Sequence, residues 1–321
     1  MENPVCPLSP PGAPSEIFIR TPGREGHFVY RKCRECGFVF LSPRPDEQEM
    51  RTYYSPEYYG EGAHKFWRWL EAVRLYFVQR RVRRVQEYFP RPGTVIDIGC
   101  GQGTFLRLLQ EQGWECHGTE LNEESASRAR RSGIPVAVGE FDKRQFLPET
   151  IDLISLWQVI EHLPDPLKTL SALRPLLKKG GIVAISTPNI DSVQARITAR
   201  RWFHLDPPRH LCLFSPQTLE GMMKSLGFRL FALHHFSMEQ NPYGWLQSLL
   251  NLMSLPENDL YGRLKNASGQ KGARSSWFNT GVTFFFAGLL LPFCILVSTL
   301  MAAMRRGGTI EAYFRLEDGR A

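Results

Sequence analysis

The 321-residue sequence has few of the features that mark secreted proteins or nucleic-acid binders. Its seven cysteines are odd in number and scattered, which argues against a disulfide framework and for free thiols in a reducing compartment. The net charge of +7 is modest and there is no lysine-rich tail, so we expect no nucleic-acid partner. The first residues are proline-rich without an apolar core, and we expect no signal peptide.

Two catalytic signatures are also missing. No Ser-His-Asp or Cys-His-Asp order suggests a hydrolase. The dinucleotide pattern Gly-x-Gly-x-x-Gly fails as well, because its third glycine, counted from Gly99, would fall on Thr104. An NAD-dependent oxidoreductase is therefore disfavoured.

The most informative stretch is residues 94–106, where an apolar strand pattern leads into three glycines and then into an apolar helical pattern. Gly99, Gly101 and Gly103 stand at alternate positions. Glycine lets a ligand approach the backbone closely and adopts positive φ where a turn needs it. Asp97, at the end of the strand pattern, suits a cationic amine better than a pyrophosphate. The stretch therefore predicts a ligand-binding turn between a buried strand and a helix.

A second strand pattern, residues 114–120, ends in Glu120, whose carboxylate can accept hydrogen bonds from both hydroxyls of a ribose. Together with Asp97 and the glycines, this acid resembles the class I S-adenosylmethionine-dependent methyltransferases. The resemblance implies an α/β fold with a Rossmann-like seven-stranded sheet, its last strand antiparallel, flanked by helices. It implies S-adenosyl-L-methionine as cofactor, held by Asp97, Gly99, Gly101, Gly103, Glu120, Leu121, Glu140, Phe141 and Trp157.

Later segments extend the resemblance over roughly residues 90–235. Residues 157–166 are similar to the Glu-His-hydrophobic-x-Asp-Pro segment of the ubiquinone-biosynthesis-like branch. A strand pattern at 228–235 is expected to pair with a last, antiparallel strand at 309–316. The remaining predicted elements are strands at 136–141, 151–156 and 182–188 and helices at 64–89 and 217–226.

Two histidines are candidate general bases. His162 and His210 each follow the carboxyl end of a predicted strand, and histidine titrates near neutral pH. An oxygen acceptor loses a proton when it is methylated, so a nearby base assists the reaction. A purely structural role stays open for each histidine.

Residues 1–62 predict an N-terminal extension with a Cys-x-x-Cys hairpin and a tyrosine-rich segment. The hairpin resembles the zinc-ribbon-like entry of some bacterial methyltransferases, in which a first Cys-x-x-Cys pair precedes a second. Here Cys6 stands alone and Ser9 holds its partner's position, so we expect a hairpin without metal. The alternative is a zinc site made of Cys6, His27, Cys33 and Cys36.

Residues 242–306 do not belong to a minimal methyltransferase. Within them, residues 281–304 carry no charge and reach the ~20 residues that a bilayer span needs. The expected return of strand 309–316 to the core disfavours a single crossing, and Pro292 predicts a break. We therefore expect a monotopic, re-entrant segment at the cytoplasmic side of the cell membrane, with Arg305 and Arg306 at the anionic face. A soluble helix pair buried against another subunit is the alternative.

The sequence thus predicts four parts: extension 1–62, methyltransferase core 63–241, insertion 242–306, and final strand and tail 307–321. The predicted activity is methyl transfer to a hydroxyl on a lipid-linked or cell-surface glycan precursor. Alternatives are a quinone-type or other small-lipid O- or C-methyltransferase, and a non-catalytic membrane adaptor that keeps the cofactor fold. Expected partners are the lipid acceptor and the cytoplasmic membrane surface; the oligomeric state is left open.

Overall fold

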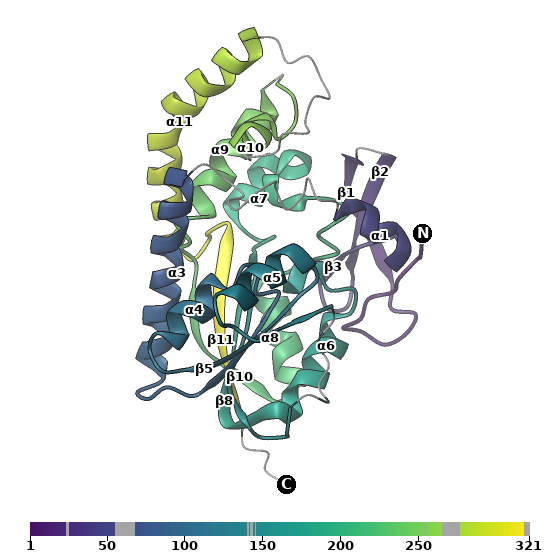
Figure 1. The fold of residues 1–321 in the computed structure, drawn as a ribbon. Coiled ribbons are helices and arrows are strands. Elements are labelled where there is room, and N and C mark those ends of the chain that lie inside the picture. Colours follow the sequence, from purple (N-terminus) through teal and green to yellow (C-terminus); the bar gives the residue numbers. More distant parts are fainter. Residues whose placement is uncertain are drawn as a thin grey trace. The chain divides into compact units, whose positions relative to one another are not determined.

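The computed structural model describes residues 1–23, 26–54, 68–139, 141, 144, 146–253, 255–264 and 277–317 (Figure 1). The chain forms two compact units, each assembled from three segments. Unit 1 consists of Met1–Arg74, Pro188–Pro216 and His235–Ile310. Unit 2 consists of Leu75–Thr187, Gln217–His234 and Glu311–Ala321.

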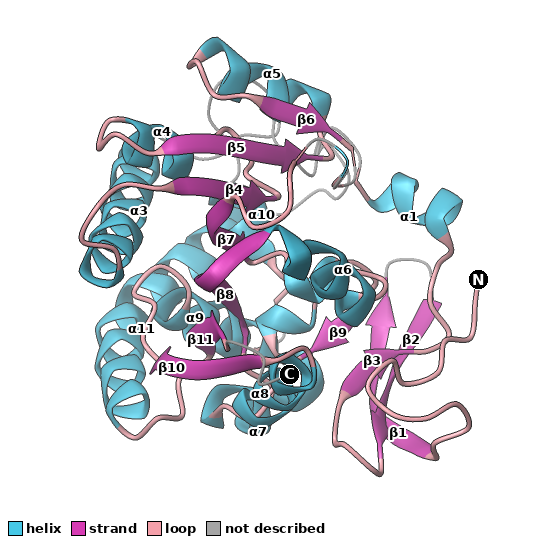
Figure 2. Ribbon diagram, turned by 90° about the horizontal axis from the view of Figure 1, so that it is seen from below, coloured by secondary structure: helices cyan, strands magenta, loops and turns pink. Residues whose placement is uncertain are grey.

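Unit 2 is built on a seven-stranded sheet in the order β10-β11-β8-β7-β4-β5-β6 (Figure 2). Strands β4 to β8 pair in parallel, whereas β11 runs antiparallel to β10. This order confirms the predicted Rossmann-like sheet with its antiparallel last strand. The strands are β4 (Thr94–Ile98), β5 (Glu115–Glu120), β6 (Val136–Val138), β7 (Ile151–Trp157), β8 (Leu177–Pro188), β10 (Phe228–His234) and β11 (Thr309–Leu316).

The predicted return of the chain to the sheet is confirmed by the register of the last two strands. Phe228 pairs with Leu316 at one end, and His234 pairs with Glu311 at the other. The chain between β10 and β11 therefore leaves the sheet and comes back to it.

Helices flank this sheet because each has one apolar face. In α3 (Arg68–Tyr88), Val78, Val82 and Val85 recur at helical spacing and pack into the core with Val95 of β4. The predicted helix over 64–89 is thus found, its first four residues lying outside the described residues. The other helices are α4 (Thr104–Gln110), α5 (Glu123–Arg131), α6 (Pro166–Leu173) and α8 (Pro216–Ser225), with 3-10 turns η2 (Ile160–His162) and η3 (Arg174–Leu176).

Unit 1 contains a second, four-stranded sheet in the order β1-β2-β3-β9. Its strands are β1 (Ser15–Gly23), β2 (Gly26–Cys33), β3 (Val39–Leu41) and β9 (Cys212–Leu213). Strand β9 comes from the segment after β8, so residues far apart in sequence share this sheet. The helices are α1 (Glu47–Tyr53), α7 (Val193–Thr198), α9 (Asn241–Leu252), α10 (Asp259–Leu264) and α11 (Trp277–Ala303), with 3-10 turns η4 (Ala199–Arg201) and η5 (Phe203–Leu205). The predicted tyrosine-rich segment beyond Tyr54 lies outside the described residues.

Helix α11 corrects one expectation. It runs unbroken from Trp277 to Ala303 with Pro292 inside it, so the predicted re-entrant break at this proline is wrong. A proline within a helix removes one backbone hydrogen bond and bends the helix, but the turns on either side can continue. Here Pro292 lies on an exposed face of the helix.

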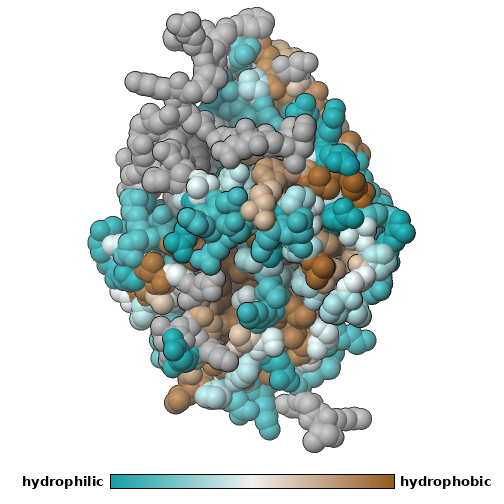
Figure 3. Space-filling model, turned by 90° about the vertical axis from the view of Figure 1, so that its right-hand side faces the viewer, coloured by the Kyte–Doolittle hydropathy of each residue, from teal (hydrophilic) through white to brown (hydrophobic). Residues whose placement is uncertain are grey.

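Helix α11 has one apolar stripe against the protein and another facing outward. Ala287 and Cys294 are buried with Trp245 and Leu250 of α9, which lies beside α11 (Figure 1). The outward stripe consists of large apolar side chains that are exposed: Phe285, Leu289, Phe293, Leu296 and Leu300. Figure 3, which draws another face of the molecule, shows hydrophilic and hydrophobic residues mixed.

Candidate functional site

The three glycines after β4 all have positive φ, but their surroundings differ. A Cβ on Gly99 would lie 2.6 Å from a methyl of Val159, and one on Gly103 would lie 2.8 Å from Cβ of Ala129. These two positions therefore need glycine for close packing as well as for their φ. A Cβ on Gly101 would meet nothing within 4 Å. The turn thus leaves open space beside Gly101, where a ligand can contact the backbone.

Glu120 joins this turn to the start of α5. Its carboxylate accepts the N–H of Gly101 at 2.9 Å through one oxygen and the N–H of Asn122 at 2.9 Å through the other. Asn122 in turn caps α5 by accepting the N–H of Ser125 at 2.8 Å. Because β4 and β5 are parallel, their carboxyl ends lie at one edge of the sheet. The predicted acid therefore stands at the glycine turn.

Asp97 is buried at the end of β4, with 2% of its surface exposed. It accepts the hydroxyl hydrogen of Ser155 at 2.7 Å, and the register of β4 with β7 pairs these two residues. Burial raises the pKa of Asp97 to about 7, while the Ser155 hydrogen bond and the charge of Arg81 hold it down. A cation bound nearby would favour the ionised carboxylate. Ser155 was not predicted; its signal was a polar residue within an apolar strand.

Trp157 is the last residue of β7, the strand that pairs with β4. Its ring packs edge-on against Phe105 at 5.3 Å, and the guanidinium of Arg81 lies 5.2 Å from its ring centroid. The indole N–H is buried without a hydrogen-bond partner among the described residues. Arg81 is one of several arginines in α3, and the sequence alone does not distinguish it from the others.

The turn η2 holds the first candidate base. His162 follows β7 as predicted. One of its ring nitrogens lies within 4.8 Å of a carboxylate oxygen of Glu161. Glu161 is fully buried and accepts the Thr187 hydroxyl hydrogen at 3.0 Å. Burial raises the pKa of Glu161 to about 8, so this carboxyl group is mostly protonated at neutral pH.

The second candidate base, His210, belongs to unit 1. Its Nδ1 lies 2.8 Å from the carbonyl oxygen of His204, and its own carbonyl accepts the Tyr30 hydroxyl hydrogen at 2.7 Å. A carbonyl can only accept, so Nδ1 carries the proton of the neutral ring. The lone pair then sits on Nε2, which is the tautomer that a general base uses.

The remaining predicted residues follow the same sheet edge. Leu121 comes directly after Glu120 and is 61% exposed. Phe141 stacks on Phe146 with ring centroids 5.7 Å apart. Glu140 lies outside the described residues.

Residues 66–233 match a protein family described as "Methyltransferase domain". The chain belongs to this methyltransferase family. Its sheet has the class I methyltransferase fold, whose cofactor is S-adenosylmethionine. The open space at Gly101 and the acid fixed beside it fit that cofactor.

The similarity to individual relatives extends over only part of this chain. A ubiquinone biosynthesis O-methyltransferase of Stutzerimonas stutzeri is 33% identical over 138 residues, which are 40% of this chain and 59% of that protein. The chain thus spans about three fifths of the curated relatives it matches.

Two solved structures share the fold at a TM-score of 0.51. One is a putative sarcosine dimethylglycine methyltransferase from Galdieria sulphuraria, 18% identical and covering 83% of this chain and 98% of that chain. The other is the [4+2]-cyclase SpnF, 16% identical and covering 86% and 99%. Because one of these proteins is named a cyclase, the shared fold by itself does not specify the reaction.

The glycine turn gives a first prediction. Gly101→Leu should abolish binding of S-adenosylhomocysteine and leave the fold intact, because the added side chain enters space that the ligand would fill. Gly133→Leu is the matched control, since Gly133 also has positive φ and open space but lies at the end of α5. Both variants carry a similar backbone strain of about 1–2 kcal/mol. Calorimetric titration checks binding, and equal affinity in the two variants would remove this turn from the site.

Asp97 gives a second prediction, on pH. A protonated Asp97 has no charge, so affinity for the cationic amine of S-adenosylhomocysteine should fall as the pH drops through about 7. The expected loss between pH 8 and pH 6 is about tenfold. Ser155→Ala removes a hydrogen bond that favours the carboxylate, so it should move the midpoint to higher pH. Asp97→Asn should bind weakly at both pH values; a pH dependence that persists in it would contradict this role.

Proposed function

We propose that the protein transfers a methyl group from S-adenosylmethionine to an oxygen of a lipid or lipid-linked acceptor. The observation that carries the proposal is the cluster of Gly101, Glu120 and Asp97 at one sheet edge. Bound there, S-adenosylmethionine supplies an electrophilic methyl group. Glu120 would hold the ribose hydroxyls, and buried Asp97 would orient the amino-acid end through its amine. Fixed geometry is the main contribution that a protein makes to such an in-line transfer.

Two acceptor classes remain for this site. The N-terminal resemblance favours a hydroxyl on a lipid-linked or cell-surface glycan precursor. The names of the relatives in the core favour a quinone precursor instead. Both acceptors join a polar, methylatable head to a long apolar tail, so both require access from a membrane surface.

Deprotonation of that oxygen would fall to His210 or His162. The hydrogen bond from Nδ1 of His210 to a carbonyl oxygen prepares its Nε2 as an acceptor of the proton. Burial raises the pKa of Glu161 to about 8, so at neutral pH this carboxyl group adds little negative charge beside His162.

The third prediction joins acceptor and base. Incubated with radiolabelled methyl donor and fractionated membrane lipids, the protein should label a lipid fraction, and chromatography of the head group should separate a glycan from a quinone precursor. His→Ala at the acting position should lower turnover by ~10²–10⁴-fold and remove the acid limb of the pH profile. His234→Gln, which can still bond Tyr88, is the control. Labelling confined to water-soluble fractions would contradict the lipid acceptor, and full turnover in both histidine variants would contradict the base.

We further propose that α11 attaches the protein to the cytoplasmic surface of the membrane. The helix has a mean hydropathy of 2.3 over its most apolar window, yet only 17% of that window is buried. One stripe is covered by α9, so α11 does not present a uniform surface to lipid. Exposed Arg305 and Arg306 follow the helix, where anionic lipid would attract them. An exposed apolar stripe followed by two arginines favours a helix that lies in the membrane interface rather than one that spans the bilayer.

Chain topology supports the same arrangement. Strands β10 and β11 pair in one sheet, so the chain must cross a bilayer an even number of times between them. Among the described residues, α11 is the one helix long and apolar enough to cross. An unbroken α11 that lies in the interface, with both of its ends on the same side of the membrane, satisfies both facts.

The fourth prediction concerns the outward stripe. Leu289→Glu/Leu296→Glu should weaken binding to anionic vesicles by about a hundredfold or more, because each leucine would contribute about 1.5–3 kcal/mol on burial. Leu147→Glu/Ile197→Glu is the matched control, as these leucine and isoleucine side chains are equally exposed elsewhere. Binding of the wild type should resist high salt, since the hydrophobic term is not screened. Vesicle sedimentation measures this binding. Equal binding of both double variants would contradict a role for the outward stripe of α11 in membrane attachment.

A further inference from the structure

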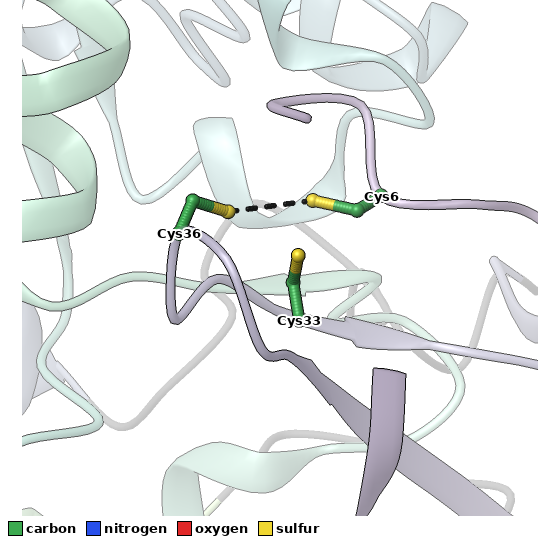
Figure 4. Close-up of side chains that lie close together, drawn as sticks. All are labelled: Cys6, Cys33 and Cys36. Atoms are coloured by element: carbon green, nitrogen blue, oxygen red, sulfur yellow. Dashed lines mark hydrogen bonds between the residues drawn. The ribbon is translucent and has the colours of Figure 1, made fainter. Parts of the chain in front are cut away.

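Three cysteines and one serine converge at the N-terminal end of unit 1. The thiols of Cys6, Cys33 and Cys36 point toward one another (Figure 4), and their sulfur atoms all lie within 4.8 Å of one another. The Cys6 and Cys36 sulfurs are 3.5 Å apart. The hydroxyl oxygen of Ser9 lies 3.3 Å from the Cys33 sulfur and also contacts the Cys6 sulfur. The four atoms form a closed group rather than a row.

These separations are close to the edges of a zinc coordination tetrahedron. With Zn–S near 2.3 Å, two sulfurs of a tetrahedral site lie about 3.8 Å apart, and an oxygen and a sulfur lie about 3.5 Å apart. The observed contacts of 3.5 Å between the Cys6 and Cys36 sulfurs and 3.3 Å between Ser9 and Cys33 are slightly shorter than those edges. All three sulfurs lie within 4.8 Å of one another, so the same three side chains can reach one central ion.

Backbone N–H groups point at two of the three sulfurs, while burial raises the pKa of the Cys6 thiol to about 12. The N–H groups of Glu35 and Cys36 point at the Cys33 sulfur, and the N–H of Leu8 points at the Cys6 sulfur. Donors aimed at sulfur stabilise its anionic form, which is the form that binds metal. Ordinary packing of buried cysteines as small apolar residues does not require such donors.

We propose that Cys6, Ser9, Cys33 and Cys36 form a zinc site with three thiolates and a fourth, oxygen-occupied position. In the sequence, Ser9 stands where a fourth cysteine is expected, and His27 is the alternative ligand; the side chain of His27 lies outside the described residues. In the fold, Ser9 occupies the corner that a fourth cysteine would fill. Its hydroxyl, or a water in its place, completes the tetrahedron. The bound ion would tie the chain at Cys6 to the end of β2.

The fifth prediction tests this site on the full-length protein. Purified under reducing conditions without chelator, it should contain about one zinc per chain by elemental analysis. Replacement by Co²⁺ should give the thiolate-to-cobalt charge-transfer absorption of a tetrahedral site. Cys36→Ser should lose the metal, whereas Cys212→Ala should keep it, because Cys212 is also buried in unit 1 but lies apart from the cluster in β9.

Ser9→Cys separates this site from adventitious binding and does not depend on a variant that fails to fold. A fourth thiolate should raise resistance to chelator competition by about tenfold or more, since zinc favours soft sulfur ligands. Unchanged affinity in Ser9→Cys would remove Ser9 from the site. Reduced wild-type protein with little zinc and no cobalt absorption would overturn the proposal.

Discussion

The Glu120 carboxylate is the interaction on which the candidate site depends. By accepting one N–H from the glycine turn and one from the start of α5, it holds two loops that follow neighbouring strands. The parallel pairing of β4 and β5 makes this bridge possible, because it brings both strand ends to one edge. Without these two hydrogen bonds, the glycine turn and the loop before α5 would not be held together. A ligand would then have to order both loops when it binds.

Burial gives the second carboxylate a different character. Asp97 lies one strand away from Glu120 yet is almost fully enclosed, and its pKa is raised to about 7. It is therefore poised between a neutral and a charged form, whereas a cationic ligand would favour the charge. Two acids with different environments thus suit two parts of one cofactor, the ribose and the amino-acid end.

Much of the core could be predicted from sequence because its signals are local. Apolar runs ending in Asp97 and Glu120, with glycines between strand and helix, determine strand ends without reference to distant residues. Ser155 and Arg81 escaped because their roles exist only after β7 and α3 are placed beside β4. The position of Ser9 escaped for a similar reason: its spacing from Cys6 shows a missing thiol, but only the folded chain brings its oxygen to Cys33. Pro292 failed in the opposite way, since a local helix breaker was overridden by continuous apolar packing against α9.

We propose above all that the glycine turn binds S-adenosylmethionine rather than a dinucleotide or no ligand. Calorimetric titration of the full-length protein with S-adenosylhomocysteine and, separately, with NAD⁺ tests it most directly. We expect S-adenosylhomocysteine to bind one molecule per chain in competition with S-adenosylmethionine, and NAD⁺ to give no binding heat. Binding of NAD⁺ at this turn, or failure of S-adenosylhomocysteine to bind the folded protein, would contradict the claim.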